Sequence, residues 1–337
     1  MKHLLPNVPH YFKANLHTHT TVSDGKFTPE EVKEIYKSRG YQILAFTDHE
    51  KFIPHQELND TDFLALDSYE LSITETDPGK KVECYHLNLF AKDPENPLRL
   101  SVPAEAGQVW ETEEKQLLFN HRADRQYSVE YANRVIAAAN KMGFLVAYNH
   151  PTWSQQEYPD YIGLKGLWGM EVYNHTCVCL GYEEYNDRVY QDLLCQGNGL
   201  FPVASDDFHH FKHGAPAGGW VMVGAEQLEY TAVIKALEQG DFYASTGPQI
   251  HSLTLEGTTL RLRCTEAASV TIRSHRRQAA RFLPEEGNPL EEVTFDIAPW
   301  LEKWATEERD NAFIRLTVTD AAGRKANTRT YWYRELI

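Results

Sequence analysis

Up to about residue 245, short apolar segments of the sequence alternate with segments of helical periodicity. Residues 43–46, ILAF, form a continuous apolar run that predicts a strand buried on both faces. The segment after Thr28 predicts a helix, because Thr28 and Glu31 form a capping box and Pro29 occupies the first helical position. Repeated strand–helix units of this kind predict a mainly parallel α/β sheet, either open or closed into a barrel.

Other segments extend this pattern. Further strands are predicted at 13–17, 63–71, 82–90, 144–148, 169–173, 200–204 and 220–223, and further helices after Ser128 and near 182–196 and 231–239. Residues 92–127 interrupt the alternation, since they are rich in Pro, Glu and Gln and show little periodicity. We therefore expect a long, lid-like insertion there.

The pattern changes near residues 246–250. From there on, about six short segments alternate apolar and polar residues between Gly, Pro and Asn, with a helical pattern only at 299–307. Short alternating strands of this kind predict a small antiparallel sandwich. The expected organisation is an α/β domain at 1–246, which includes the insertion, and a β-sandwich domain at 247–337.

Side chains that bind metals follow the predicted strands. Six of these strands each bring a His, Asp or Glu near the carboxyl end, and the residues are His17, His19, His49, Glu70, His86, His150, Asp207 and His209. Active sites of parallel α/β folds are assembled at that end of the sheet. Mixed imidazole and carboxylate donors suit Zn²⁺, Mn²⁺ or Fe²⁺. Each residue taken singly has an ordinary structural explanation, such as a core histidine at position 86, but together they predict a metal site.

Composition limits the classes of protein that this chain can be. The net charge of −15 argues against non-specific DNA binding, although a local metal cluster still permits a small phosphorylated substrate. No apolar run approaches the ~18 residues of a membrane span, and the first residues lack a signal-peptide pattern, so a cytoplasmic enzyme is expected. Five cysteines do not suggest a disulfide framework, and Cys177 and Cys179 are expected to be buried at a strand end.

Four motifs carry a family resemblance, and in chain order they are LHTHTTVSDG at 16–25, FTDHE at 46–50, NHP at 149–151 and SDDFH at 205–209. With them, roughly residues 10–245 resemble the polymerase and histidinol phosphatase (PHP) family of metal-dependent phosphoesterases. The segment GDFYASTGP and the sandwich after it are most similar to stand-alone bacterial members of that family. The resemblance implies a distorted (β/α)₇ barrel with up to three divalent metal ions at the carboxyl ends of its strands.

The resemblance also implies which residues bind each ion. The first ion is expected on His17, His19, Glu70 and Asp207, the second on Glu70, His86 and His150, and the third on Asp24, His49 and His209. Asp206 and Asp48 are expected behind these ligands. Asp48 would orient a histidine ligand through its free ring nitrogen.

The implied reaction is hydrolysis of a phosphate ester, either a monoester or a diester, by a hydroxide that bridges metal ions. No side chain is then needed as a nucleophile, and the sequence has neither a G-x-S-x-G nor a P-loop motif. Candidates to bind the phosphate or protonate the leaving group are His175, His210, His213 and Lys212. Arg122 and Arg125 would cover a phosphate if the insertion folds over the site.

The expected partner is a small phosphorylated substrate or a nucleotide, with no membrane partner. Two alternatives stay open. The same metal cluster could hydrolyse an amide or a lactone, or the chain could be a metal-stabilised binding module without turnover. The predicted sandwich domain fits all three functions.

Overall fold

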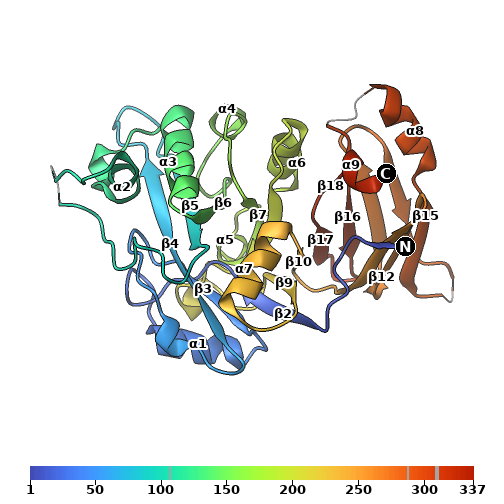
Figure 1. Ribbon diagram of the computed structural model, residues 1–337, viewed down its shortest axis with the longest axis horizontal. Coiled ribbons are helices and arrows are strands. Elements are labelled where there is room, and N and C mark those ends of the chain that lie inside the picture. The colour runs from blue at the N-terminus through green and yellow to red at the C-terminus, as the bar shows by residue number, and fades with distance from the viewer. Residues whose placement is uncertain (106–107, 287, 308–310) are drawn as a thin grey trace.

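The structure is a computed structural model that describes residues 1–105, 108–286, 288–307 and 311–337. A large α/β part lies on the left of Figure 1 and a smaller part, rich in strands, lies on the right. The two ends of the chain both lie in the smaller part (Figure 1). Among the described helices, none is both long and apolar enough to cross a membrane.

The large part is built on a mixed sheet. Its strands are β2 (His10–Asn15), β3 (Ile43–Phe46), β4 (Leu64–Thr74), β5 (Cys84–Ala91), β6 (Phe144–Tyr148), β7 (Gly169–Asn174), β8 (Phe201–Ser205), β9 (Trp220–Ala225) and β10 (Phe242–Ser245). The pairs β2–β3, β3–β4, β6–β7 and β7–β8 are parallel. The pairs β4–β5, β5–β6, β2–β9 and β9–β10 are antiparallel.

The expectation of a mainly parallel sheet is therefore wrong at β5 and β9. Only residues 75–83 connect β4 to β5. Such a connection is too short for the crossover that a parallel pair needs, which takes about a dozen residues or more, so the chain turns back as a hairpin.

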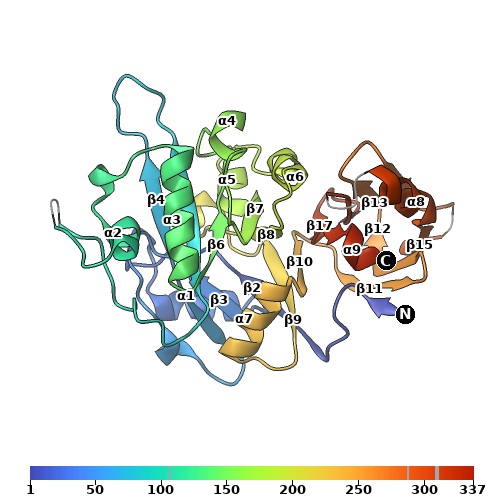
Figure 2. The same cartoon turned by 45° about the horizontal axis from the view of Figure 1, so that its top comes forward.

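Helices cover the outside of this sheet (Figure 2). They are α1 (Pro29–Lys37), α2 (Glu113–Phe119), α3 (Val129–Lys141), α4 (Tyr158–Tyr161), α5 (His175–Cys179), α6 (Asp187–Cys195) and α7 (Tyr230–Gln239), with 3₁₀ turns η1 (Gln56–Leu58), η2 (Arg122–Asp124) and η3 (Phe211–His213). The predicted capping box of α1 is confirmed, since the Glu31 amide donates to the Thr28 hydroxyl and the Thr28 amide to the Glu31 carboxylate. Strand β3 is buried along its whole length, as its apolar run predicts.

The sheet runs in one path from β2 to β8, and among the described residues β8 forms no ladder back to β2. Two backbone hydrogen bonds nevertheless join the segments that follow these strands, from His19 N to Phe208 O and from Asp207 N to His17 O. The first and last strands thus meet just beyond their carboxyl ends. The closed barrel that the resemblance implies stays a prediction.

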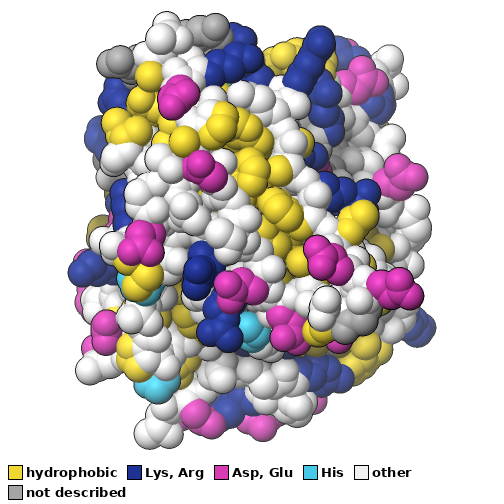
Figure 3. Space-filling view, turned by 90° about the vertical axis from the view of Figure 1, so that its right-hand side faces the viewer, with side chains coloured by type: hydrophobic (Ala, Val, Ile, Leu, Met, Phe, Trp, Pro, Cys, Tyr) yellow, Lys and Arg dark blue, Asp and Glu magenta, His cyan; other side chains and the backbone are white. Residues whose placement is uncertain are grey.

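The smaller part contains β1 (Lys2–His3), β11 (Ile250–Glu256), β12 (Thr259–Ala267), β13 (Ser269–Ser274), β14 (Ala279–Phe282), β15 (Leu290–Asp296), α8 (Ala298–Glu307), β16 (Phe313–Thr319), β17 (Lys325–Thr328), β18 (Tyr331–Trp332) and α9 (Tyr333–Leu336). All its recorded strand pairs are antiparallel. Its outer face carries a band of hydrophobic side chains between charged ones (Figure 3).

The two parts are joined by main-chain pairing. Strand β10 pairs with β9 on one side and with β17 on the other, so the large sheet continues into the smaller part. The N-terminal strand β1 pairs with β11, and Leu4 and Leu5 pack in the core of the smaller part. Residues 2–5 thus lie with the C-terminal segment, although the sequence analysis assigned them to the first domain.

Candidate metal centre

The residues predicted to bind metals meet at one edge of the large sheet. His17, His19 and Asp24 follow β2, His49 follows β3, His150 follows β6, and Asp207 and His209 follow β8. The other two differ from the expectation that every ligand ends a strand. Glu70 lies inside β4, and His86 is the third residue of β5.

Strand length and direction explain these two positions. Strand β4 is longer than β3, and the backbone after β3 stays paired with it as far as Glu70, through Glu50 N to Glu70 O at 2.7 Å. Glu70 is therefore level with His49. Because β5 is antiparallel to β4, its beginning lies at the edge where its neighbours end, which brings His86 to the same place.

Four side chains surround one point between β2, β4 and β8. The two Nε2 atoms of His17 and His19 are 3.2 Å apart, and each lies 3.3–3.4 Å from a carboxylate oxygen of Glu70. Asp207 Oδ1 lies 3.2 Å from His17 Nε2 and 3.1 Å from His19 Nε2. Four ligands at about 2.0–2.1 Å from a tetrahedral zinc ion are about 3.3–3.4 Å from one another. These donors therefore have the spacing of one ion's ligand shell.

The Glu70 carboxylate also lies close to histidines on β5 and in the segments after β3 and β6. Its Oε1 lies 3.1 Å from His86 Nδ1 and 3.4 Å from His150 Nε2, and its Oε2 lies 3.0 Å from His49 Nδ1. Besides His17–His19–Glu70, the groups here whose donor atoms lie close enough to hold a metal ion are His17–His150–Asp207 and His49–Glu70–His86. His86 and His150 thus fall into neighbouring groups, and their sharing of a second ion stays a prediction.

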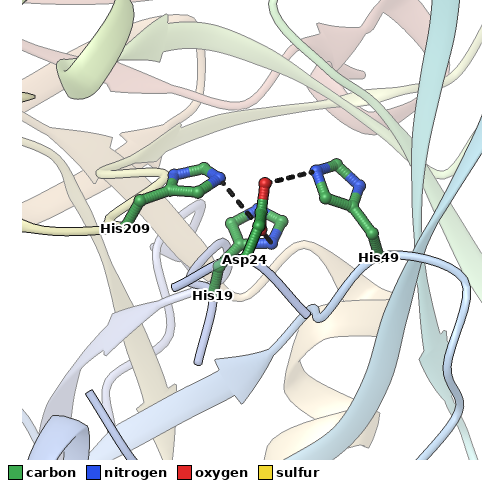
Figure 4. Close-up of side chains that lie close together, drawn as sticks. All are labelled: His19, Asp24, His49 and His209. Atoms are coloured by element: carbon green, nitrogen blue, oxygen red, sulfur yellow. Dashed lines mark ion pairs between the residues drawn. The ribbon is translucent and has the colours of Figure 1, made fainter. Parts of the chain in front are cut away.

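A further group surrounds Asp24 (Figure 4). Its Oδ1 lies 3.5 Å from His209 Nε2 and 3.6 Å from His19 Nδ1, while its Oδ2 lies 3.7 Å from His49 Nε2. The expected set Asp24, His49 and His209 is brought together, and His19 joins it as a fourth member. Asp24 is half exposed, whereas the His19 ring is buried.

Several buried ligand atoms of this centre lie close to one another but form no hydrogen bond within the described structure. His19 Nδ1, His49 Nδ1, Glu70 Oε2 and Asp207 Oδ1 are buried and accept or donate no hydrogen bond. Leaving such atoms unpaired is costly, so groups of this kind are normally satisfied. Divalent cations among them would satisfy all four, and the donor chemistry therefore fits metal ions.

The charges at the centre favour ionised carboxylates. Burial opposes ionisation of Glu70, but the imidazoles of His86 and His17 hold its pKa well below the ordinary value. Burial likewise opposes charge on His209, yet its hydrogen bond with Asp24 and the charge of Asp207 raise its pKa to about 9. Without a metal ion, His209 therefore keeps a proton at neutral pH beside the carboxylates of Asp24 and Asp207.

Glu171 in β7 supports the centre from behind, and the sequence analysis did not identify it. His17 Nδ1 donates to Glu171 Oε1 at 2.6 Å, and the Ser205 hydroxyl donates to the same oxygen. Its Oε2 accepts from the His150 amide at 3.1 Å and from Asn174 Nδ2 at 3.0 Å. A carboxylate on one ring nitrogen fixes the tautomer that leaves the other nitrogen free for a metal. The only sequence signal is one acidic residue within the apolar strand GMEVY.

Asp48 and Asp206 were expected to support the ligands from behind, but the hydrogen bonds recorded for their carboxylates go to other groups, mainly backbone amides. Asp48 contacts no histidine ring among its recorded partners, and its Oδ1 accepts from the amides of Thr20 and Ser23 at 2.8 and 3.0 Å. It thereby shapes the loop that carries Asp24. Asp206 accepts from the Tyr36 hydroxyl, and its remaining partners are the amides of Ala217, Gly218 and Gly219.

Two ligand positions have left-handed backbones. The φ angles of His150 and Asp207 are +24° and +53°, a region that residues other than glycine rarely adopt. Such conformations cost about 1–3 kcal/mol each and are characteristic of functional sites. In both cases the strand has just ended, and this conformation brings the side chain into the centre.

The centre opens into a pocket of about 210 Å³, here called the metal pocket. Of the proposed substrate-binding histidines, His213 lines this pocket and the other two do not. His175 lies behind the wall, where its Nδ1 is 2.9 Å from the Tyr173 hydroxyl. His210 lies against the His213 ring, and its Nδ1 accepts from the Lys212 amide. Trp153 also lines the pocket, beside His86 and His150.

The insertion at 92–127 contacts the centre through Glu50, the neighbour of His49. Arg125 is buried and bonds Glu50 twice, with Nη2 to Oε2 at 2.7 Å and Nη1 to Oε1 at 2.9 Å. The expectation that Arg125 covers a phosphate is wrong, because the buried carboxylate of Glu50 takes its guanidinium. Arg122 is half exposed and also contacts Glu50, with Nε to Oε1 at 3.1 Å.

The expected burial of the cysteines holds for one of the two. Cys177 is buried, whereas Cys179 is exposed. Both lie on α5 rather than at the end of a strand, because the chain enters this helix directly after β7.

Solved structures that are similar to this chain include three of low sequence identity. One is described as a two-domain protein from Bacteroides vulgatus ATCC 8482 containing a predicted PHP-like metal-dependent phosphoesterase, with 16% identity, a TM-score of 0.46 and coverage of 98% of each chain. Another is an amidohydrolase from Chromobacterium violaceum with bound sulfate and no metal, with 15% identity and a TM-score of 0.37, covering 60% of this chain and 89% of that one.

A third structure, from Bifidobacterium adolescentis ATCC 15703, is described as a metal-dependent phosphoesterase, with 18% identity and a TM-score of 0.34, covering 61% of this chain and 89% of that one. No protein-family model matches the chain, and no curated protein matches it.

Proposed function

We propose that this chain is a metal-dependent phosphoesterase of the PHP type. The observation that carries the proposal is the group of His17, His19, Glu70 and Asp207, in which each imidazole Nε2 lies 3.1–3.4 Å from an oxygen of both carboxylates. The two neighbouring groups, one around Glu70 and one around Asp24, offer enough donor atoms for more than one ion. The closed barrel and the assignment of nine ligands to two or three ions belong to the same proposal.

Divalent ions held by these groups would supply activation of water and neutralisation of charge on a phosphoryl group. The chain's own residues prepare the site for this chemistry. Glu171 holds the His17 ring with Nε2 free, and Asp48 fixes the loop that carries Asp24. Trp153 and Leu180 contribute apolar walls that reduce the access of bulk water to the pocket.

His213 is the candidate to donate a proton to the leaving group. It lines the metal pocket but belongs to none of the metal-binding groups, so its ring nitrogens stay available to a substrate. A positioned imidazole contributes about 10²–10⁴-fold to a reaction that needs proton transfer. Replacement of His213 should therefore lower kcat for esters with poor leaving groups more than for nitrophenyl esters, whose leaving groups need no proton.

The test is hydrolysis by protein reconstituted with Zn²⁺, Mn²⁺ or Fe²⁺ in turn. A panel of phosphomonoesters and phosphodiesters would be assayed beside lactones and amides, with His17→Ala as the inactive variant. His251→Ala is the matched control, since His251 is exposed on β11 in the smaller part. We expect phosphoester turnover that His17→Ala abolishes and His251→Ala leaves unchanged. Turnover of lactones or amides alone would contradict the proposal.

A protein that binds metal and cleaves nothing in the panel would instead indicate a binding module. In that case His17→Ala and His19→Ala would change only the thermal stability of the protein. This outcome would also overturn the proposal.

A further inference from the structure

The metal pocket is too small for a whole substrate. Its volume is about 210 Å³, whereas sites for small organic ligands measure about 300–1,000 Å³. A phosphoryl group at the metal-binding residues would leave the rest of the ester outside the pocket. The rim there is apolar and exposed, since Leu180 lines the pocket with 45% of its surface accessible.

A second cavity lies on the other side of α5. This α5–β17 cleft has a volume of about 650 Å³ and includes in its lining Tyr173, His175, Tyr182, Tyr185, Arg324 and Lys325. One wall comes from β7 and the segment after it in the large part, and the other includes the turn before β17 and the first residue of β17 in the smaller part. The cleft is therefore large enough for the organic part of a small ester.

The metal pocket and the cleft share α5 as a wall. Thr176 and Cys177 face the metal pocket, and His175 and Val178 face the cleft. The backbone of Gly218 packs directly against the His175 ring on this wall. A side chain at Gly218 would clash with the ring, since its Cβ would lie 2.0 Å from Nδ1 of His175. The short helix α5 lies between the two cavities, and Leu180, the residue after it, lines the metal pocket with an exposed side chain.

The cleft offers positive charge in an acidic protein. Lys325 forms no ion pair with any carboxylate that the structure describes, and its Nζ lies 3.8 Å from the centre of the Tyr185 ring. Arg324 contacts Asp320 through Nε at 2.7 Å and is otherwise exposed. The chain as a whole carries a net charge of −15, so cations placed here are distinct from its general surface.

Two acidic residues, Glu183 and Glu184, also line the cleft. The buried Glu184 carboxylate accepts from the amides of Thr152 and Trp153 at 3.2 and 2.7 Å, so it is held away from the cations. Glu183 is exposed at the rim. Tyr182, with 38% of its surface accessible, adds an uncovered aromatic ring to the same wall. Aromatic rings beside cations are suited to a planar, anionic group.

We propose that the α5–β17 cleft binds the leaving-group side of the substrate and selects esters that carry an aromatic ring and a second anionic group beyond the ester phosphate. The proposal rests on the proposed phosphoesterase function and adds its substrate class. Lys325 attracts the distal anion, and Tyr182 contacts the ring.

The test measures binding of four phosphonates to the metal-reconstituted protein by isothermal titration calorimetry. The probes are phenylphosphonate and biphenyl-4-phosphonate, each with and without a carboxylate at the far end of the ring system. Two lengths are used so that the carboxylate reaches the cleft from the metal pocket in at least one probe. The variants are Lys325→Met, which removes only the charge, and Lys325→Arg, which keeps it. Lys303→Met on α8, an exposed lysine outside the cleft, is the matched control.

We expect the carboxylate to tighten binding by about threefold to fivefold in the wild-type protein for at least one length, as for a partly exposed ion pair. Lys325→Met should lose this gain and still bind the parent probe that lacks the carboxylate, whereas Lys325→Arg and Lys303→Met should retain the gain. A gain that is absent for both lengths, or that persists in Lys325→Met, would overturn the inference.

The same data separate this inference from the proposed function. If the wild-type protein hydrolyses phenyl phosphate and binds phenylphosphonate without any effect of the carboxylate, only the cleft assignment is wrong. If it neither hydrolyses the ester nor binds the phosphonate, the phosphoesterase proposal itself is wrong.

Discussion

Replacement of Glu171 by Gln should weaken metal binding without removing any ligand. The carboxylate accepts four hydrogen bonds, from His17 Nδ1 and Ser205 on one oxygen and from the His150 amide and Asn174 on the other. An amide keeps one oxygen and turns the other into a donor, so two of the four donors lose their acceptor whichever way it is oriented. Each buried donor left unpaired costs about 1–3 kcal/mol.

The effect on metal binding follows from the two orientations. With the amide oxygen toward His17, the ring keeps its orientation but loses the negative charge behind it. With the amide nitrogen toward His17, the ring nitrogen Nδ1 can no longer donate, and the metal-binding tautomer is disfavoured. Losses of this kind reduce metal affinity by about 10–100-fold, which corresponds to about 1.4–2.7 kcal/mol.

Glu184→Gln provides a matched control. Glu184 is also a buried carboxylate, and it accepts from the amides of Thr152 and Trp153 and from the side chain of Asn186. It contacts none of the proposed ligands through these bonds. Competition with a chelator of known affinity should show a weaker tightest site in Glu171→Gln and an unchanged one in Glu184→Gln, while thermal unfolding shows destabilisation of both. Equal metal affinity in the wild type and Glu171→Gln would refute the reasoning.

Three further results are expected. Asp24→Ala should empty one metal site selectively, whereas His17→Ala should empty the neighbouring one; loss of the same single site in both variants, measured by elemental analysis, would contradict this division. Burial raises the pKa of Asp67 to about 6 from 3.8, so the folded protein binds this proton more tightly and loses stability as the pH rises from about 4 to 6. Asp67→Asn should therefore gain up to about 3 kcal/mol at pH 7.5 and almost nothing at pH 4, and a gain that did not depend on pH in denaturant titrations would exclude this explanation. Arg125→Met leaves the buried carboxylate of Glu50 without its main partner and should cost about 3–5 kcal/mol of unfolding free energy, whereas a loss below 1 kcal/mol would show that the pair is dispensable.

The proposed ligands within the four motifs could be predicted because their signal is local. His17, His19 and Asp24 lie within ten residues, and the other motifs each put a charged or imidazole side chain next to a strand end that hydrophobicity identifies. The order and direction of the strands then bring these side chains together at one edge of the sheet. Glu171 gives no such signal, since it is one acidic residue in an apolar strand and its partner is 154 positions away.

The direction of β5 and the role of Asp48 were harder to predict for different reasons. Strand direction depends on the connection, and the short segment 75–83 was the available indication of a hairpin. Asp48 is adjacent in sequence to His49, but successive side chains of an extended segment point in opposite directions. It therefore faces Thr20 and Ser23 while His49 faces the centre.

The most direct test of the account is the number of metal ions that the protein holds. Metal-free protein would be reconstituted separately with Zn²⁺, Mn²⁺ and Fe²⁺, freed of unbound ions and measured by elemental analysis against protein concentration. The three groups of donors predict two to three equivalents of at least one of these metals. Fewer than two equivalents with every metal would contradict a polynuclear centre at this edge of the sheet.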